Sequence, residues 1–248
     1  MPDGREILLV AGQQLELKVR VNPRARRIGL RIDPSDGQVV LSLPHRRLLR
    51  EGLAFARGQW RWIASHRAAV PPPVPFAEGS EIPILGRRHV ILHCPKLRGG
   101  VQRQPGRLLV SGDPEYLARR VTDWLRDEAR QELSRRACAL AARIGRRVRR
   151  ISVRDTRSRW GSCAADGTLS FSWRLLLAPE PVLDYVVAHE VAHLAHRNHG
   201  PAFWALVERL CPGHARQRDW LRSHGAGLYR YGQSPAGEEI RPVPLAQV

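Results

Sequence analysis

Residues 182–199, VLDYVVAHEVAHLAHRNH, begin with a run of apolar side chains and end in a histidine-rich segment. The apolar run predicts a buried helix. Four residues advance an α-helix by about 400°, so the imidazoles of His189 and His193 lie one turn apart on nearly the same face. Both imidazoles can therefore reach one metal ion, and the segment predicts a metal-binding helix around which the fold is organised.

Glu190 directly follows the first of these histidines. Its carboxylate is expected on the adjacent flank of the helix, where it can act on a water at the metal without binding the metal. Two histidines and a glutamate in this H-E-x-x-H spacing are typical of hydrolases that combine a metal-activated water with a carboxylate base. We therefore predict Glu190 as the catalytic general base and Zn²⁺, or another divalent metal, as the cofactor.

A catalytic zinc site needs a third protein ligand and keeps its fourth position for water. His199 is the best candidate, because the segment NHGP at residues 198–201 marks a chain reversal that can return this side chain to the ion. His196 competes for the role. A rigid helix would carry it about 300° round from His193, away from the ion.

The first 112 residues predict a β-rich N-terminal region. Residues 7–43 alternate apolar and polar side chains, with PSDG at 34–37 as a turn between strands. Residues 46–68 place apolar side chains on one helical face, and the proline-rich residues 70–75 form a stiff connector. Short β segments come next, which form either a second small sheet or a continuation of the first.

The remaining chain predicts a helical domain at residues 113–225 and an irregular tail at 226–248. The tail is rich in glycine and proline. Within the domain, the patterns and turn signals predict a long helix over about 115–144, a β-hairpin around AADG at 164–167, the metal-binding helix over about 179–196, and helices at about 201–210 and 214–223. The fold class is therefore α+β.

The motifs RWGSC (159–163) and LLLAPEPVLDYVVAHEVAHLAHRNHGPAFWALVERLCPG (175–213) resemble the YgjP-like family of predicted zinc metallopeptidases. These are bacterial and archaeal proteins of the broader zincin class. The resemblance is close over about 150–225 and looser over the N-terminal β region. It implies a zincin-like catalytic domain at 113–225, with His189, His193 and His199 as zinc ligands and Glu190 as base.

Two related families help to place the resemblance. The YgjP-like core is similar to that of SprT-like proteases, which act on proteins bound to DNA. The spacing also looks like the metzincin pattern H-E-x-x-H-x-x-G-x-x-H, but His196 stands at the glycine position. A metzincin further needs a methionine below the metal, and Met1 is the only methionine in the chain.

The net charge of +18 suggests an anionic partner, such as nucleic acid. Nearly all of the positive charge is arginine, with lysine only at Lys18 and Lys96, and such a bias also arises from the nucleotide composition of a gene. Both interpretations stand, because charge bears on association and not on chemistry.

Neither a membrane span nor a secretion signal is expected. No apolar run reaches about 18 residues, and the start MPDGREILLVAG has an acidic residue and too short an apolar stretch. We therefore expect a cytoplasmic protein. The cysteines form no C-x-x-C pair and predict reduced, mostly buried thiols. Cys163 is expected as a small packed residue, with a catalytic thiol as the alternative.

Catalysis also needs a donor or cation for the developing oxyanion. Arg157 and Arg159 precede the hairpin, and Tyr229 and Tyr231 come after the last ligand, so these four are the candidates. Zincins bind an extended peptide along a strand beside the active helix, for which residues 151–157 or 168–174 are the candidates.

Other side chains near the motif have simpler expected roles. Trp160 and Trp173 are predicted to pack beneath the site, and a stripe over residues 203–207 is predicted to cover the metal helix. Asp184 and Glu208 could hold a ligand imidazole, but a solvated face is the expected position of both.

The leading hypothesis is a zinc-dependent metallopeptidase that acts on polypeptide. The alternative keeps the metal and changes the substrate to a nucleoside triphosphate, because a metal, a positioned water and many arginines also suit phosphoanhydride hydrolysis. A third hypothesis is a DNA-associated protease or a nucleic-acid-binding module with a structural metal. Structural zinc usually has four ligands with cysteine among them, which the sequence does not offer here.

Overall fold

The computed structural model describes residues 4–10, 13–33, 37–68, 70–157 and 159–233. The described chain is α+β, as predicted, with three small sheets. Contacts divide it into two compact units, Met1–Pro73 with Gln233–Val248, and Val74–Gly232. We call them the first and the second unit. None of the described helices is long and apolar enough to span a membrane.

The first unit is a four-stranded sheet with short helices. The outer pairs of strands are antiparallel and the central pair is parallel. Residues 34–36, the first part of the expected PSDG turn, lie outside the described residues. In sheet order the strands are β1 (Gly4–Val10), β2 (Gln13–Val21), β4 (Val39–Leu43) and β3 (Gly29–Ile32), and the chain continues with η1 (Arg46–Leu48), α1 (Leu49–Gly58) and α2 (Trp60–Ala68).

The expected single helix over 46–68 is wrong, because the chain breaks it between α1 and α2. Gln59 takes a non-helical conformation directly after Gly58. The break lets both short helices turn an apolar side chain to the sheet, through the buried Ala56 and Ile63. Helix α1 also approaches β4 closely at Gly52, where a Cβ atom would lie 2.6 Å from Leu43 Cδ2.

The second unit contains the other two sheets. One is a separate four-stranded sheet with the same order and directions as the sheet of the first unit, although the sequence shows no repeat. The other is a three-stranded sheet beside the metal helix. The strands in order are β5 (Glu81–Ile84), β6 (Arg87–His93), β8 (Arg107–Val110) and β7 (Val101–Gln104), and then β10 (Gly161–Cys163), β11 (Thr168–Ser172) and β9 (Arg150–Arg154).

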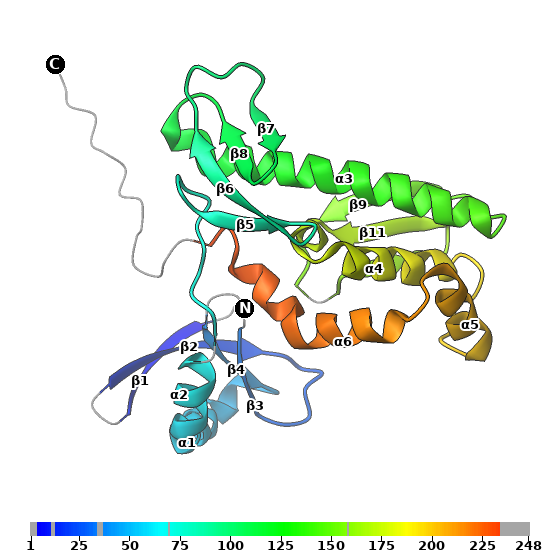
Figure 1. The fold of residues 1–248 in the computed structure, drawn as a ribbon. Coiled ribbons are helices and arrows are strands. Elements are labelled where there is room, and N and C mark those ends of the chain that lie inside the picture. The colour runs from blue at the N-terminus through cyan, green and yellow to red at the C-terminus, as the bar shows by residue number, and fades with distance from the viewer. Residues whose placement is uncertain (1–3, 11–12, 34–36, 69, 158, 234–248) are drawn as a thin grey trace. The chain divides into compact units, whose positions relative to one another are not determined.

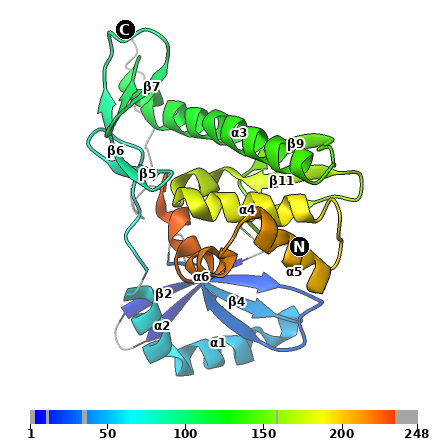
Figure 2. The same ribbon diagram turned by 45° about the vertical axis from the view of Figure 1, so that its right-hand side comes forward.

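Two helices supply the largest shares of the core of the second unit and lie side by side (Figures 1 and 2). Helix α3 (Leu117–Arg143) comes after the short η2 (Pro114–Tyr116), and helix α4 (Glu180–Ala192) comes after η3 (Trp173–Leu177). Helix α4 is buried nearly all round, as the continuous apolar run predicted. It stops before His193, four residues earlier than expected.

The boundary between the units differs from the expected one at 112/113. The sheet β5–β8 packs into the same core as α3, through buried residues such as Ile82, Ile91 and Leu108. The boundary therefore lies at Pro73/Val74, inside the proline-rich connector.

The last helices are α5 (Pro201–Leu210) and α6 (His214–His224), close to the predicted ranges. The expected irregular tail begins instead with η4 (Gly225–Arg230), after which Tyr231 forms a parallel bridge with Val74. The rest of the tail, 234–248, lies outside the described residues.

Candidate metal centre

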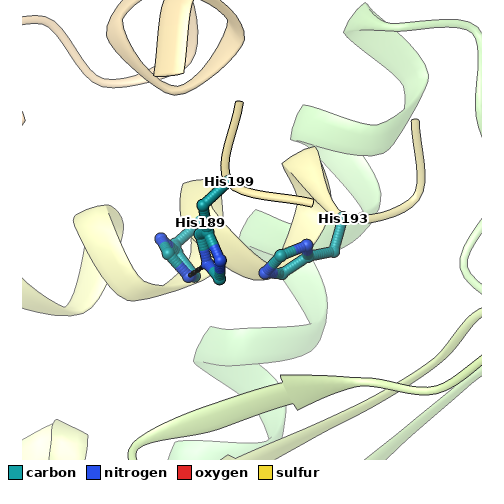
Figure 3. A group of neighbouring side chains, drawn as sticks. All are labelled: His189, His193 and His199. Atoms are coloured by element: carbon teal, nitrogen blue, oxygen red, sulfur yellow. Dashed lines mark hydrogen bonds between the residues drawn. The ribbon is translucent and has the colours of Figure 1, made fainter. Parts of the chain in front are cut away.

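Three imidazoles meet where helix α4 ends. His189 comes from its last turn, His193 lies directly after it, and the chain then reverses and returns His199 to the same place. One ring nitrogen from each lies within 4.8 Å of the others, and His189 Nε2 is 3.1 Å from His199 Nε2. Figure 3 shows the three rings pointing toward one another. His196, the competitor, is not a member of this group.

The donor set fits a zinc ion. Nitrogens that each lie about 2.0–2.1 Å from a tetrahedral zinc lie about 3.3 Å from one another, close to the spacing of His189 and His199. Three neutral nitrogen donors with room for a fourth group are the usual protein part of a catalytic zinc site.

The backbone of His196 fixes the orientation of the His193 ring. His193 Nδ1 lies 3.1 Å from the carbonyl oxygen of His196, and because a carbonyl only accepts, Nδ1 is the atom that donates. The Nε2 lone pair is thereby left for a metal. Burial lowers the pKa of His193, and this hydrogen bond opposes the shift.

His189 is the most enclosed of the three histidines. Its ring packs edge-on against Tyr185 and Phe203, with centroids 5.9 and 5.0 Å away. Burial, and then the neighbouring histidines, lowers the pKa of His189 to about 4. Its imidazole is therefore neutral at pH 7, the state that binds a metal.

Glu190 lies beside the triad in an unusual environment for a carboxylate. It is only 5% exposed, and burial raises its pKa to about 7, with Arg159 acting in the opposite direction. A carboxyl whose pKa lies near the working pH can both accept and return a proton. Its environment is thus that of a general base rather than of a surface glutamate.

Strand β10 forms the wall opposite Glu190. A Cβ atom on Gly161 would lie 2.5 Å from Glu190 Oε1 and 2.6 Å from Glu190 Cγ, so only glycine lets the strand come this close. Gly161 was not predicted from the sequence as a functional residue. The only sign of this role in the sequence was the glycine of the motif RWGSC, because a glycine inside a strand often marks a close approach of the backbone.

A hollow of about 430 Å³ opens over the triad. Its floor is the metal helix and its wall is β10 with the turn after it. Arg197 also lines it and donates to the carbonyl oxygen of Ala165, at 3.0 Å. Neither Arg197 nor the strand was singled out from the sequence. The lining residues are Gly161, Ser162, Cys163, Ala164, His189, Glu190, His193, Arg197 and His199.

The four oxyanion candidates do not line this hollow. Tyr229 is buried and donates its hydroxyl to the carbonyl of Thr156, at 2.6 Å. The backbone carbonyl of Tyr231 accepts from the buried Arg174, at 2.9 Å. Arg157 and Arg159 are exposed, and of these two only Arg159 acts on the pKa of Glu190.

The two carboxylates proposed to hold a ligand imidazole have other partners. Asp184 Oδ1 lies 2.7 Å from Nε of the buried Arg136. Glu208 accepts from the backbone N–H of Gly213 and pairs with His214 Nδ1, at 2.9 and 2.7 Å. Neither of these contacts reaches the triad.

The apolar residues near the site behave largely as predicted. Trp173 is buried in the core, and Trp160 packs on Tyr229 with ring centroids 5.3 Å apart. Phe203, the start of the predicted stripe, lies against the imidazoles of His189, His193 and His199 at centroid distances of 4.5–5.0 Å. This packing holds the imidazoles from one side.

The cysteines form no disulfide and are less buried than predicted. Cys138 is exposed, and Cys94, Cys163 and Cys211 are half-buried. Burial, and then the charge of Glu190, raises the pKa of Cys163. A raised pKa disfavours the thiolate, so the environment of Cys163 does not suit a nucleophile.

Comparisons with known proteins agree with the motifs. The family described as "YgjP-like, metallopeptidase domain" matches residues 26–224, which confirms the resemblance. A solved structure, the metallopeptidase zymogen of Pyrococcus abyssi abylysin, is similar at 22% identity over 38% of this chain and 91% of that chain, with a TM-score of 0.33. A search of curated proteins finds no match.

Proposed function

We propose, since the chain belongs to the YgjP-like metallopeptidase family, that it is a zinc-dependent peptidase with Glu190 as general base. One observation carries the proposal. A carboxyl with a pKa raised to about 7 lies next to three imidazoles whose nitrogens converge on one point. Metal ligands and a tuned base are the two parts that water-mediated hydrolysis needs.

The chain's own residues have distinct parts in the proposed reaction. His189, His193 and His199 would hold the ion, which supplies Lewis-acid activation of water and of the scissile carbonyl. Glu190 Oε accepts the proton of the attacking water and returns it to the leaving amine. Arg159, whose charge acts on Glu190, and Arg197, which lines the hollow, are the proposed cations for the oxyanion.

The substrate backbone is proposed to pair with strand β10. Of the expected candidates, residues 168–174 contain β11, which is paired on both sides, and 151–157 contain β9, at the opposite edge of the sheet. Strand β10 is the edge that also lines the hollow. An extended peptide added at this edge would place a carbonyl group over the triad.

The test is a hydrolysis assay of wild type and Glu190→Gln with zinc present. An unfolded polypeptide and a panel of nucleoside triphosphates are offered separately, each with and without DNA. Loss of a general base lowers kcat by about 10²- to 10⁴-fold. We expect polypeptide cleavage by the wild type and a loss of this size in the variant, with zinc content unchanged.

Glu208→Gln is the matched control, because Glu208 is an exposed glutamate outside the hollow. It should cleave polypeptide at the wild-type rate. Triphosphate hydrolysis that Glu190→Gln abolishes, without any polypeptide cleavage, would overturn the peptidase and favour the phosphohydrolase.

A further inference from the structure

A second hollow, of about 650 Å³, lies against the segment that carries the metal ligands. Helix α5, the end of α3 and the segment after α4 form it. Its lining combines an apolar floor with cations, and we call it the basic hollow. The residues that define it are Ile144, Ala195 and Leu206, together with Arg146, His196 and Arg209.

The two arginines of the basic hollow have no carboxylate partner within 4.0 Å in the described part of the chain. The acidic groups on the neighbouring elements already pair with other residues. Asp166 pairs with Arg149 at 2.8 Å, Glu208 pairs with His214, and Asp184 pairs with Arg136. The positive charge of Arg146 and Arg209 is therefore available to an external anion.

The basic hollow is connected to the metal centre through one short segment. Residues 193–199 contribute His193, Arg197 and His199 to the active-site hollow, and Ala195 and His196 to the basic hollow. The backbone carbonyl of His196 also holds Nδ1 of His193. A molecule seated in the basic hollow would thus contact the segment that places two ligands.

We infer that the basic hollow is an exosite for an acidic and apolar segment of the polypeptide substrate. This inference rests on the proposed peptidase function. Carboxylates of the substrate pair with Arg146 and Arg209, and its apolar side chains cover Ile144 and Leu206. A small inorganic anion would bind the arginines but leave the apolar floor exposed to solvent. An amphipathic peptide covers both, so it is the better complement.

The experiment measures binding apart from cleavage. Full-length Glu190→Gln protein is titrated against a short fluorescent peptide that alternates leucine and glutamate, and against the same peptide with glutamine for glutamate. The pair Arg146→Ala/Arg209→Ala should weaken binding of the glutamate peptide about tenfold, because two partly exposed ion pairs are lost. Binding of the glutamine peptide should change less than about twofold.

Arg143→Ala/Arg147→Ala is the matched control. It removes the same charge from two exposed arginines, at the end of α3 and just after it, that do not line the hollow. We expect it to leave the glutamate peptide within about twofold of its starting affinity. An equal loss with both pairs would show general attraction to a basic surface and would overturn the exosite.

A charge swap keeps the test decisive if the alanine pair affects folding. Arg146→Glu/Arg209→Glu should prefer a leucine–lysine peptide to the leucine–glutamate one, and no reversal would reject the inference. Displacement of the peptide by inorganic phosphate equally well in both alanine pairs would also reject it. Binding with this pattern but without any hydrolysis by the wild type would instead count against the peptidase and leave the basic hollow as a binding site for an acidic, apolar peptide.

Discussion

The two units of the chain differ in the size of their buried cores. In the first unit, buried apolar residues form two small clusters, one around Leu17 and Ile63 and one around Leu41. In the second unit, one continuous core extends from Phe76 to Leu228. All of the candidate chemistry lies in this unit, and in the part of the first unit that the structure describes no group of side chains could hold a metal.

The candidate metal centre needs the larger core. Glu190 has a raised pKa because the surroundings of α4 exclude water, and His189 has a lowered pKa for the same reason. Desolvation of this size requires packing on several sides, which a sheet with two short helices does not supply. Glu208, fully exposed in the same unit, shows the contrast, because its hydrogen bonds to Gly213 and His214 lower its pKa.

The largest expected effect is the loss of a ligand in the second unit. His199→Ala should weaken zinc binding by more than about 100-fold, since loss of even an outer hydrogen-bond partner weakens it by about 10- to 100-fold. His196→Ala keeps the backbone carbonyl that holds His193 and should bind zinc as the wild type does. Competition with a chromophoric chelator measures both, and the reverse ranking would make His196 the third ligand.

The pH dependence of stability tests the burial of Glu190. In the metal-free protein its pKa is about 7, against 4.5 when it is exposed, so the folded state binds more protons between these values. The contribution of Glu190 to the free energy of unfolding is fully present below pH 4.5 and is lost as the pH rises through 7. The loss is about 3 kcal/mol.

His189 acts in the opposite direction. Its pKa of about 4 lies below the ordinary 6.5, so the unfolded state binds more protons and stability rises between these values. Because His189 is present in both proteins, its effect cancels when Glu190→Gln is compared with the wild type. The free energy of unfolding of the variant should therefore rise by about 3 kcal/mol relative to that of the wild type between pH 4.5 and 7. Urea unfolding with a chelator measures this difference. A difference that stays constant with pH would mean that Glu190 titrates like an exposed glutamate.

A smaller effect is expected from the close approach of β10 to Glu190. Gly161→Ala forces the carboxylate or the strand to move, because the new methyl group would meet Glu190 Oε1 at 2.5 Å. A displacement of this kind should lower kcat/KM by about 10- to 100-fold while zinc content is kept. Gly227→Ala, where no heavy atom lies within 4 Å, is the control and should be silent. Full activity of Gly161→Ala would show that the contact is not needed.

The smallest effect on zinc affinity is expected from the truncation of a core side chain in the first unit. Leu41→Ala should lower the free energy of unfolding by about 2–5 kcal/mol and leave zinc affinity within about twofold. Leu133→Ala, in α3 of the second unit, should lower both stability and zinc affinity. Calorimetry and zinc titration of the two variants compare the units directly. Loss of zinc in Leu41→Ala would remove the distinction between them.

The features that the sequence predicted correctly depend on local geometry. Helical periodicity places His189 and His193 on one face, and the NHGP reversal explains how His199 reaches them. The α+β class and the positions of α3, α5 and α6 also result from apolar spacing and from helix-breaking residues.

The features that the sequence did not predict depend on distant contacts. Tyr229 is paired with Thr156, 73 residues away, so its place downstream of His199 in the sequence was misleading. Gly161 acquires its role only from the approach of Glu190, and the boundary at Pro73 only from the packing of β5–β8 on α3. Tertiary packing, rather than propensity, decides all three.

Anomalous diffraction at the zinc edge from crystals of the zinc-loaded protein tests the central claim most directly. We expect one peak per chain in the second unit, about 2.0–2.1 Å from a ring nitrogen of each of His189, His193 and His199. Glu190 should lie beside the peak without coordinating it. A peak that lacks one of these imidazoles, or that is coordinated by His196 or a cysteine instead, would contradict the proposed site.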